Sequence, residues 1–432
     1  MRMSAAIVCV FLAASGAAAQ TCAPYWGSIP TSGIPGYPNT PYVVFDDGTG
    51  PTLYVLESPG YVYRWRRQGW ELLPRTGLPD PPIACWGLIG LNEADGPSLF
   101  ARIYSDSLLT YRWRHGEWSV MPESFWPPDT GIENWPMTTA DLGDGVHIYG
   151  KIDRTLVVRW NGVAWERIGE VAGSARSIEA MIGYGSGKAQ SLYVFGQFYS
   201  VDGVPAQGFA KWDGTTWSAP WPGVVTSGEG GRLLTVYDDG TGPKLYSNYK
   251  PEFSGVSRRG LHRWDGATWE FVGGPDAGQF TIVEFHGLHI FDDGSGPGLY
   301  VTGIFRDFGG VPAKSIVRYD STGFHVVPGG DVWSGAVGHG VIRDERGESL
   351  MMGGGYTGAN IGTKGLLVGC RLPTCQPNCD LSEGPKRLNV NDFVCFINKY
   401  AALDPYANCN VDSVIDINDF ACFMTKFAQG CP

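Results

Sequence analysis

A stretch of oxygen-bearing residues near the C-terminal end is the first candidate for chemistry. Asn408, Asn410, Asp412, the carbonyl of Val414, Asp416 and Asp419 occupy positions 1, 3, 5, 7, 9 and 12 of one polar loop. Calcium takes six to eight oxygen ligands, and alternate residues of a tight loop direct their oxygens inward. The spacing therefore predicts a calcium loop.

An earlier polar stretch repeats part of this pattern. Its matching residues are Asn378, Asp380, Ser382, Asn389 and Asp392, with an insertion around Gly384. An amphipathic helical pattern follows each loop and carries Phe, Cys, Phe and a further aromatic residue on one side. We expect calcium in both loops. The alternative is a disulfide-braced helical pair whose loops keep their shape and bind metal weakly.

Paired aspartates form a second group of candidates. Asp46-Asp47, Asp238-Asp239 and Asp292-Asp293 each stand in an FDDGTGP-like turn. They could serve as acid and base or as calcium ligands. Their recurrence instead favours a structural turn, in which Asp-Gly supplies the positive φ of a tight hairpin. His286 and His289 fall on opposite faces of a regular strand, so we expect no shared metal there.

Internal repeats must position these turns. Tryptophan-rich segments such as YRWRRQGW, RWNGVAW and RWDGATW recur at intervals of about 50 residues. The Asp-Asp turns are followed by the strand-like runs LYVLE, LYSNY and LYVTG. Six units are complete. We expect an all-β fold, a β-propeller with about four strands in each repeat, in which the two aromatic residues of a unit pair across neighbouring strands.

A seventh unit is divided between the two ends of the chain. Residues 338–370 supply the early strands, and the segment CAPYWGSIP supplies the missing last one, with Trp26 aligned to Trp269. Joining the terminal strands removes exposed sheet edges. The alignment also brings Cys22 and Cys370 to the same turn, so we expect a disulfide between them. The predicted propeller, of seven blades, covers residues 21–372.

The ends of the chain indicate export. Residues 1–20 have a short positive start, an apolar run and small residues, as in a signal peptide. We therefore expect a secreted, extracellular or cell-surface protein. The net charge of -11, without a basic patch, argues against nucleic acid, and no apolar run predicts a membrane span. Cysteines concentrate after residue 369, which predicts a small disulfide-rich module over 373–432.

That module resembles a known family. Its two halves, with NVNDF and DINDF, are similar to a dockerin type I domain of the cysteine-containing kind found on secreted bacterial proteins. The resemblance implies an EF-hand-like pair that binds calcium and attaches to a cohesin-like or cell-surface protein. In that family, the module often attaches polysaccharide-degrading enzymes. The DDGxGPxLYV and RWDGxxW elements resemble kelch-like propellers.

The sequence contains no GxSxG, HExxH or GxxxxGK[ST] motif. Our leading hypothesis is a non-catalytic recognition or scaffold protein, with polysaccharide as one ligand class. The alternatives are a dockerin-borne polysaccharide lyase or glycoside hydrolase, and a structural surface-layer component. The tryptophans outside the repeat pattern are the better ligand candidates: Trp86, Trp126, Trp135, Trp221 and Trp333.

Overall fold

The chain is described here from a computed structural model. The described residues are 25–28, 42–48, 51–57, 60–66, 69–79, 84–93, 96–104, 108–121, 138–173, 176–185, 190–226, 233–253, 256–275, 284–293, 295–328, 336–344, 347–354, 365–368, 389–401, 407 and 417–429. The predicted signal peptide, the predicted second calcium loop before Ile417, and both Cys22 and Cys370 lie outside these residues.

Six antiparallel blades follow one another along the chain, each with four strands in chain order. Blade I is β2 (Tyr42–Asp46), β3 (Pro51–Glu57), β4 (Tyr61–Arg66) and β5 (Gly69–Leu72); blade II is β6 (Ala84–Glu93), β7 (Gly96–Tyr104), β8 (Leu108–Arg114) and β9 (Glu117–Val120); blade III is β10 (Thr138–Asp141), β11 (Val146–Ile152), β12 (Leu156–Trp160) and β13 (Trp165–Ala172). Blade IV is β14 (Ser177–Tyr184), β15 (Ser191–Gln197), β18 (Phe209–Trp212) and β19 (Trp217–Ser218); blade V is β21 (Leu234–Asp238), β22 (Pro243–Ser247), β25 (Leu261–Trp264) and β26 (Trp269–Gly273); blade VI is β27 (Glu284–Asp292), β28 (Pro297–Ile304), β29 (Ile316–Asp320) and β30 (Gly323–Val326).

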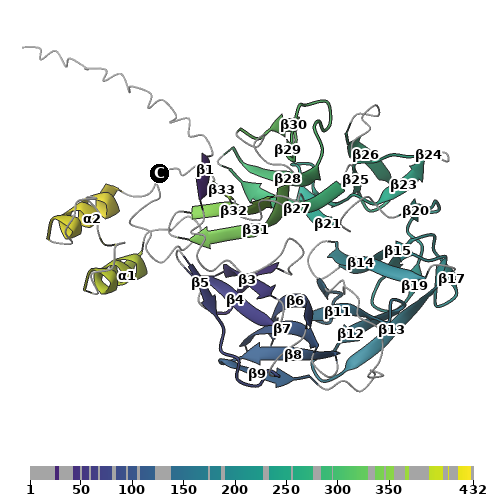
Figure 1. Cartoon of the computed structure of the whole chain (residues 1–432), viewed down its shortest axis with the longest axis horizontal. Coiled ribbons are helices and arrows are strands. Elements are labelled where there is room, and N and C mark those ends of the chain that lie inside the picture. The colour runs from purple at the N-terminus through teal and green to yellow at the C-terminus, as the bar shows by residue number, and fades with distance from the viewer. Residues whose placement is uncertain are drawn as a thin grey trace, which may run out of the picture.

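A further four-stranded sheet joins the two ends of the chain. This terminal sheet has the order β1 (Tyr25–Ser28), β33 (Gly365–Val368), β32 (Gly347–Gly354) and β31 (Ala336–Asp344). Its strand β31 contacts β27 of blade VI on one side and β2 of blade I on the other. The sheets therefore follow one another around a ring (Figure 1), and the predicted pairing of the N-terminal strand with the GLLV strand is confirmed.

The register of that closing pair differs from the alignment by two residues. Trp26 lies opposite Leu367, whereas the alignment with Trp269, which lies opposite Trp264, would place it opposite Gly369. Side chains alternate between the two faces of a strand, so a shift of two residues keeps each residue on the same face. The hydrophobic pattern therefore could not distinguish the two registers.

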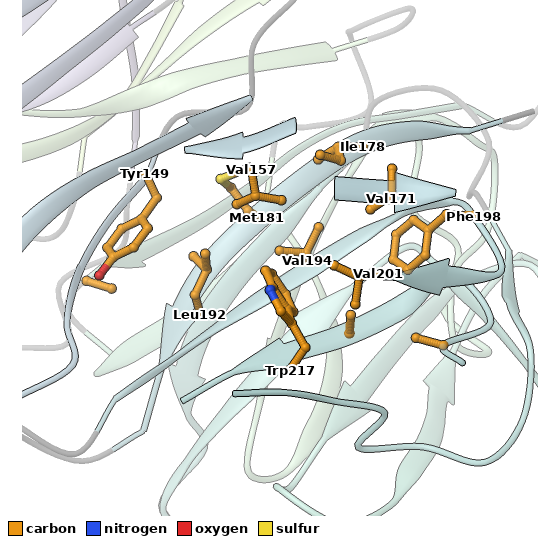
Figure 2. Close-up of a cluster of buried hydrophobic side chains, with 13 residues drawn as sticks. Tyr149, Val157, Val171, Ile178, Met181, Leu192, Val194, Phe198, Val201 and Trp217 are labelled. Carbon is orange, nitrogen blue, oxygen red and sulfur yellow. The ribbon is translucent and has the colours of Figure 1, made fainter. Parts of the chain in front are cut away.

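The hydrophobic cores lie between successive blades. Tyr149 and Val157 of blade III pack in one cluster with Met181 and Leu192 of blade IV (Figure 2). Equivalent clusters join I to II, II to III, IV to V, V to VI, and VI to the terminal sheet. Each blade therefore depends on its neighbours to bury its faces.

The repeated tryptophans pack in the manner that the sequence predicts. Trp264 faces Trp269 across the last two strands of blade V, with ring centroids 5.4 Å apart. Trp65 and Trp70 form the matching pair of blade I at 5.2 Å. Trp65 and Trp264 are almost fully buried, so these rings stabilise the blades rather than form an exposed platform.

Hairpins inserted between the second and third strands connect neighbouring blades. In blade IV, β16 (Ser200–Val201) and β17 (Val204–Pro205) extend the sheet of blade III, because β16 pairs with β13. In blade V, β23 (Lys250–Phe253) and β24 (Val256–Ser257) pair through β23 with β20 (Val225–Thr226). These insertions cover strand edges that would otherwise be exposed.

Two helices follow the propeller. α1 (Val390–Ala401) and α2 (Ile417–Gln429) stack Phe396 on Phe423, with centroids 3.8 Å apart. At the start of α1, Asn389 Oδ1 accepts the Asn391 N–H at 2.8 Å, and Asp392 accepts the Asn389 N–H at 2.8 Å. This reciprocal arrangement is a capping box. Neither helix, nor any other described one, is long and apolar enough to cross a membrane.

Candidate ligand pocket between two blades

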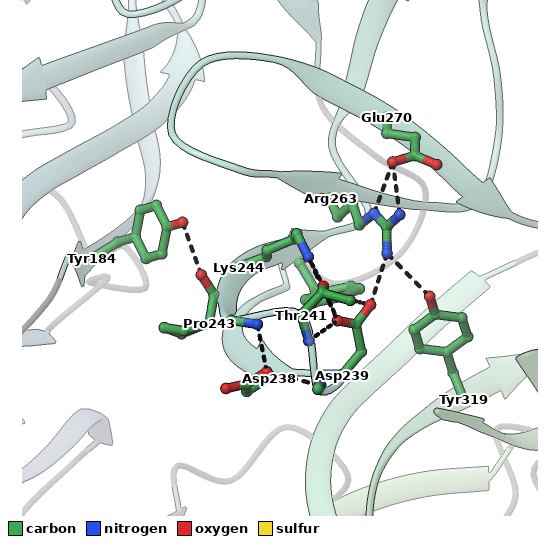
Figure 3. Close-up of polar contacts among 12 residues, drawn as sticks. Tyr184, Asp238, Asp239, Thr241, Pro243, Lys244, Arg263, Glu270 and Tyr319 are labelled. Carbon is green, nitrogen blue, oxygen red and sulfur yellow. Dashed lines mark hydrogen bonds and ion pairs between the residues drawn. The ribbon is translucent and has the colours of Figure 1, made fainter. Parts of the chain in front are cut away.

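The second aspartate of each Asp-Asp turn is used within its own blade. Asp239 Oδ2 accepts a hydrogen bond from the hydroxyl of Tyr246 at 3.1 Å. It accepts a second from Nη1 of Arg263 at 2.8 Å (Figure 3). Arg263 also binds Glu270 and the hydroxyl of Tyr319 in blade VI. Burial tends to raise the pKa of Asp239, but hydrogen bonds from Thr241 and Tyr246 and the charge of Lys244 outweigh it, so the pKa is lowered.

The same cluster recurs in two other blades. Asp47 binds Tyr54 at 2.7 Å and Arg64 at 2.7 Å in blade I. Asp293 binds Tyr300 at 2.8 Å in blade VI, with Arg318 3.8 Å away.

The first aspartate of each pair instead closes the turn. Asp238 Oδ1, for example, accepts the N–H groups of Gly240 and Gly242. Each pair thus forms part of a turn and an ion-pair network within its own blade, as the recurrence of the motif predicts.

A pocket lies where the hairpins of blades IV and V approach each other. Its volume is about 380 Å³. The wall from blade IV comprises residues 196–199, Gln207 and Gly208, and the facing wall comprises residues 224–226 and Lys250. Val225 is held between the two hairpins, because its N–H donates to Gln207 and its strand pairs with β23. The pocket therefore depends on the contact between two blades.

Glycines allow the backbone segments beneath this pocket to approach closely. Gly208 has a φ of +80°, and a Cβ atom there would lie 2.1 Å from the carbonyl oxygen of Val225. A Cβ at Gly196 would lie 2.0 Å from the carbonyl oxygen of Ser177. Larger residues would separate these segments, so the pocket floor requires glycine at both positions.

A buried carboxylate supports one wall of the pocket. Glu179 is 7% exposed. Its Oε1 accepts Nε2 of Gln197 at 2.8 Å, and its Oε2 lies 3.4 Å from the hydroxyl of Tyr249 in blade V. Glu179 therefore fixes the Gln197 side chain at the pocket wall and also links the two blades.

The lining residues combine an aromatic ring with polar groups. Tyr199 is 57% exposed as a residue. The polar residues of the lining are Gln197, Gln207, Thr226 and Lys250. Amides and hydroxyls both donate and accept hydrogen bonds, so this wall can bind ligands with several hydroxyl groups.

A β-bulge, which periodicity cannot reveal, places Glu179. It is the extra residue between Ile178 and Ala180 on β14, and His286 is its counterpart on β27. Bulges re-aim side chains, so the strict alternation used to separate His286 from His289 does not hold across this strand. Among the described residues, no three His, Cys, Asp or Glu side chains could hold a metal ion together.

The other predicted site residues are placed only in part. Asn389, Asp392 and Asp419 are described, and both aspartates are fully buried at the starts of their helices. Asn378, Asp380, Ser382 and the remaining residues of the second loop lie outside the described residues, as do Trp126, Trp135 and Trp333. Trp221 packs edge-on against Trp264, 6.1 Å between centroids. The backbone of Trp86 lies at the bulge of β6.

Comparisons with known proteins concern the fold. No protein-family model matches the chain, and no curated protein matches it in sequence. A solved chain of the mitotic checkpoint complex is 14% identical over 85% of this chain and 100% of that chain, with a TM-score of 0.46. BBS1N in complex with ARL6DN is 12% identical over 81% and 98%, at 0.45. A fucose-specific lectin from Aleuria aurantia is 12% identical over 68% and 96%, at 0.35.

A buried histidine of blade V gives this blade a pH dependence. His262 on β25 is fully buried and packs against Phe271. Burial lowers the pKa of His262 from 6.5 to about 4, and the nearby charges of Arg258 and Lys250 act in the same direction. The folded state therefore binds a proton less readily than the unfolded state does.

We predict that stability is fully present above pH 6.5 and falls by about 3 kcal/mol between pH 6.5 and pH 4 because of His262. His262→Leu should flatten this part of the profile, as measured by urea unfolding at several pH values. His115→Asn, which alters an exposed turn, should keep the wild-type profile. An unchanged pH profile in His262→Leu would contradict the prediction.

Proposed function

We propose that this protein is an exported recognition protein whose propeller binds carbohydrate in the pocket between blades IV and V. The exposed ring of Tyr199 beside Gln197 and Gln207 carries the proposal. Sugar rings present a C–H face that stacks on aromatic rings, and their hydroxyls pair with amides. A pocket of about 380 Å³ is within the range of small-ligand sites.

The pocket is also preorganised for binding. Gln197 is held by Glu179, and Val225 is held by backbone hydrogen bonding to Gln207. A ligand would therefore order few additional side chains, which lowers the entropic cost of binding. Export rests on the sequence of residues 1–20, and polysaccharide outside the cell is the ligand class that this location makes available.

We propose further that the terminal sheet is the seventh blade of the ring. Tyr25 lies opposite Val368 at the end of the ladder. Cys22 precedes Tyr25 by three residues and Cys370 follows Val368 by two, so both thiols belong to the same end of the paired strands. A disulfide between them would lock the ring.

We propose that the C-terminal module binds calcium and attaches the propeller to a cohesin-like or cell-surface protein. Asp392 and Asp419 are fully buried in the first turns of α1 and α2, where a loop's last ligand would stand. Their carboxylates and the oxygen-rich stretches before them fit calcium chemistry. The capping box of α1 uses some of these oxygens, and a carboxylate can accept more than one partner.

The first prediction from the proposed function concerns the pocket. Tyr199→Ala should weaken binding to a carbohydrate ligand, identified on a glycan array, by at least about tenfold in calorimetric titration, because the stacking surface is lost. Val163→Ala removes a 76% exposed apolar side chain from the turn of blade III and should leave affinity unchanged. Equal affinity in the wild type and Tyr199→Ala would place the ligand elsewhere.

The second prediction concerns closure. Non-reducing peptide mapping should recover Cys22 and Cys370 in one linked peptide. Cys370→Ser should lower the free energy of unfolding by about 2–5 kcal/mol, the usual effect of losing a native disulfide. Cys85→Ser on β6 should leave the linked peptide intact. Recovery of both cysteines as free thiols would refute the bond.

The third prediction concerns the module. Millimolar calcium should raise the melting temperature of the full chain's C-terminal transition, and Asp419→Asn should reduce the shift because a ligand charge is lost. Asp404→Asn changes an acidic residue outside the proposed loop positions and should retain the shift. A melting profile that calcium leaves unchanged would remove calcium from the proposal.

A further inference from the structure

We infer that the pocket between blades IV and V selects a 6-deoxy sugar, whose ring carries a methyl group where a common hexose carries a hydroxymethyl group. This inference rests on the proposed function of the pocket as a carbohydrate site. It adds the class of sugar, which follows from where the chain places apolar side chains around the pocket.

Val224 presents an apolar side chain on one wall of the pocket. It lines the pocket and is 37% exposed. Its backbone continues the ladder of β20, because its carbonyl oxygen accepts the Glu252 N–H at 2.9 Å. The next residue, Val225, is 2% exposed and belongs to the hydrophobic cluster that joins blades IV and V. Successive side chains of a strand point to opposite faces, so Val224 lies on the face away from that cluster.

The facing wall supplies a second apolar surface. Tyr199 is 57% exposed, whereas Phe198 before it is 3% exposed and belongs to the cluster that joins blades III and IV. The same alternation therefore directs Tyr199 away from the core. Between the two walls, the floor includes Gly196 and Gly208, which have no side chains. A ligand at this place therefore meets an aromatic side chain on one wall, an aliphatic side chain on the other, and backbone beneath.

The polar groups of the pocket limit where sugar hydroxyls can bind. Thr226 Oγ1 donates to the carbonyl oxygen of Lys250 at 3.3 Å, so the proton of this hydroxyl is used within its own strand pair. Gln207 is exposed, and it lies on the wall that faces Val224. A sugar hydroxyl can pair with the Gln207 amide, whereas a hydroxyl placed against Val224 would lose water without gaining a partner from that side chain. Glu252 is half-buried and does not line the pocket.

A methyl group and a hydroxymethyl group differ by one hydroxyl. Against Val224, the methyl group gains burial of apolar surface, whereas the hydroxyl of a hydroxymethyl group must be desolvated. Apolar pockets discriminate between such ligands by about ten- to hundredfold. Neither effect involves a net charge, so the preference should stay constant as ionic strength rises.

The test uses matched pairs of methyl glycosides and the full mature chain. The glycosides of L-fucose, L-rhamnose and D-quinovose are titrated calorimetrically beside those of L-galactose, L-mannose and D-glucose, which differ from them only by the added hydroxyl. We expect at least one deoxy glycoside to bind at least about tenfold more tightly than its partner. Val224→Thr, which exchanges one methyl group for a hydroxyl, should remove this preference while retaining binding of the partner sugar. Val163→Thr, on an exposed turn of blade III, and Glu252→Gln serve as controls and should keep it.

Each outcome separates this inference from the proposed function. Equal binding of both members of every pair, with no effect of Val224→Thr, would overturn the deoxy-sugar preference and leave a carbohydrate pocket. A preference lost equally in Val224→Thr and Val163→Thr would also overturn it, because the effect would then not arise in the pocket. Binding of none of these glycosides, with glycan-array binding lost in Tyr199→Ala, would refute only the deoxy-sugar class. No glycan binding at all would refute both.

Discussion

Burial of blade faces is the constraint on which this structure depends. No blade covers its own hydrophobic residues, because each cluster joins residues of two successive sheets. A row of such sheets would leave a hydrophobic face exposed at either end, and a ring removes both ends. The terminal sheet completes the ring because β1, from the start of the chain, pairs with β33 near its end.

Residues that recur serve this architecture, and binding features occur where the repeat is interrupted. The Asp–Tyr–Arg clusters and the tryptophan pairs hold each blade together and use the groups that looked most reactive in the sequence. The pocket instead uses Tyr199 and Lys250, which belong to inserted hairpins, and Glu179, which belongs to a bulge. A scaffold can therefore keep its repeated contacts while the insertions determine what it binds.

The sequence predicted what depends on local pattern. Aromatic pairs such as Trp264 and Trp269, the turn role of Asp238, and the pairing of the N-terminal strand all follow from periodicity. The contacts between blades could not be predicted from this periodicity. Tyr199 and Lys250 are about fifty residues apart in the sequence and line one pocket only because two hairpins pair with adjoining strands. The two-residue shift of Trp26 leaves no periodic signal, because it keeps each side chain on the same face. The bulge at Glu179 interrupts the alternation, and the sequence pattern does not mark where it does so.

Hydrogen–deuterium exchange with and without an oligosaccharide identified on a glycan array tests the central claim most directly, because it locates the ligand without altering the protein. The account predicts slower exchange in residues 196–208, 224–226 and 250–253, which line the pocket or adjoin it, and unchanged exchange in blade I. Protection confined to the central strands, to another blade, or to the α1–α2 pair would contradict the account.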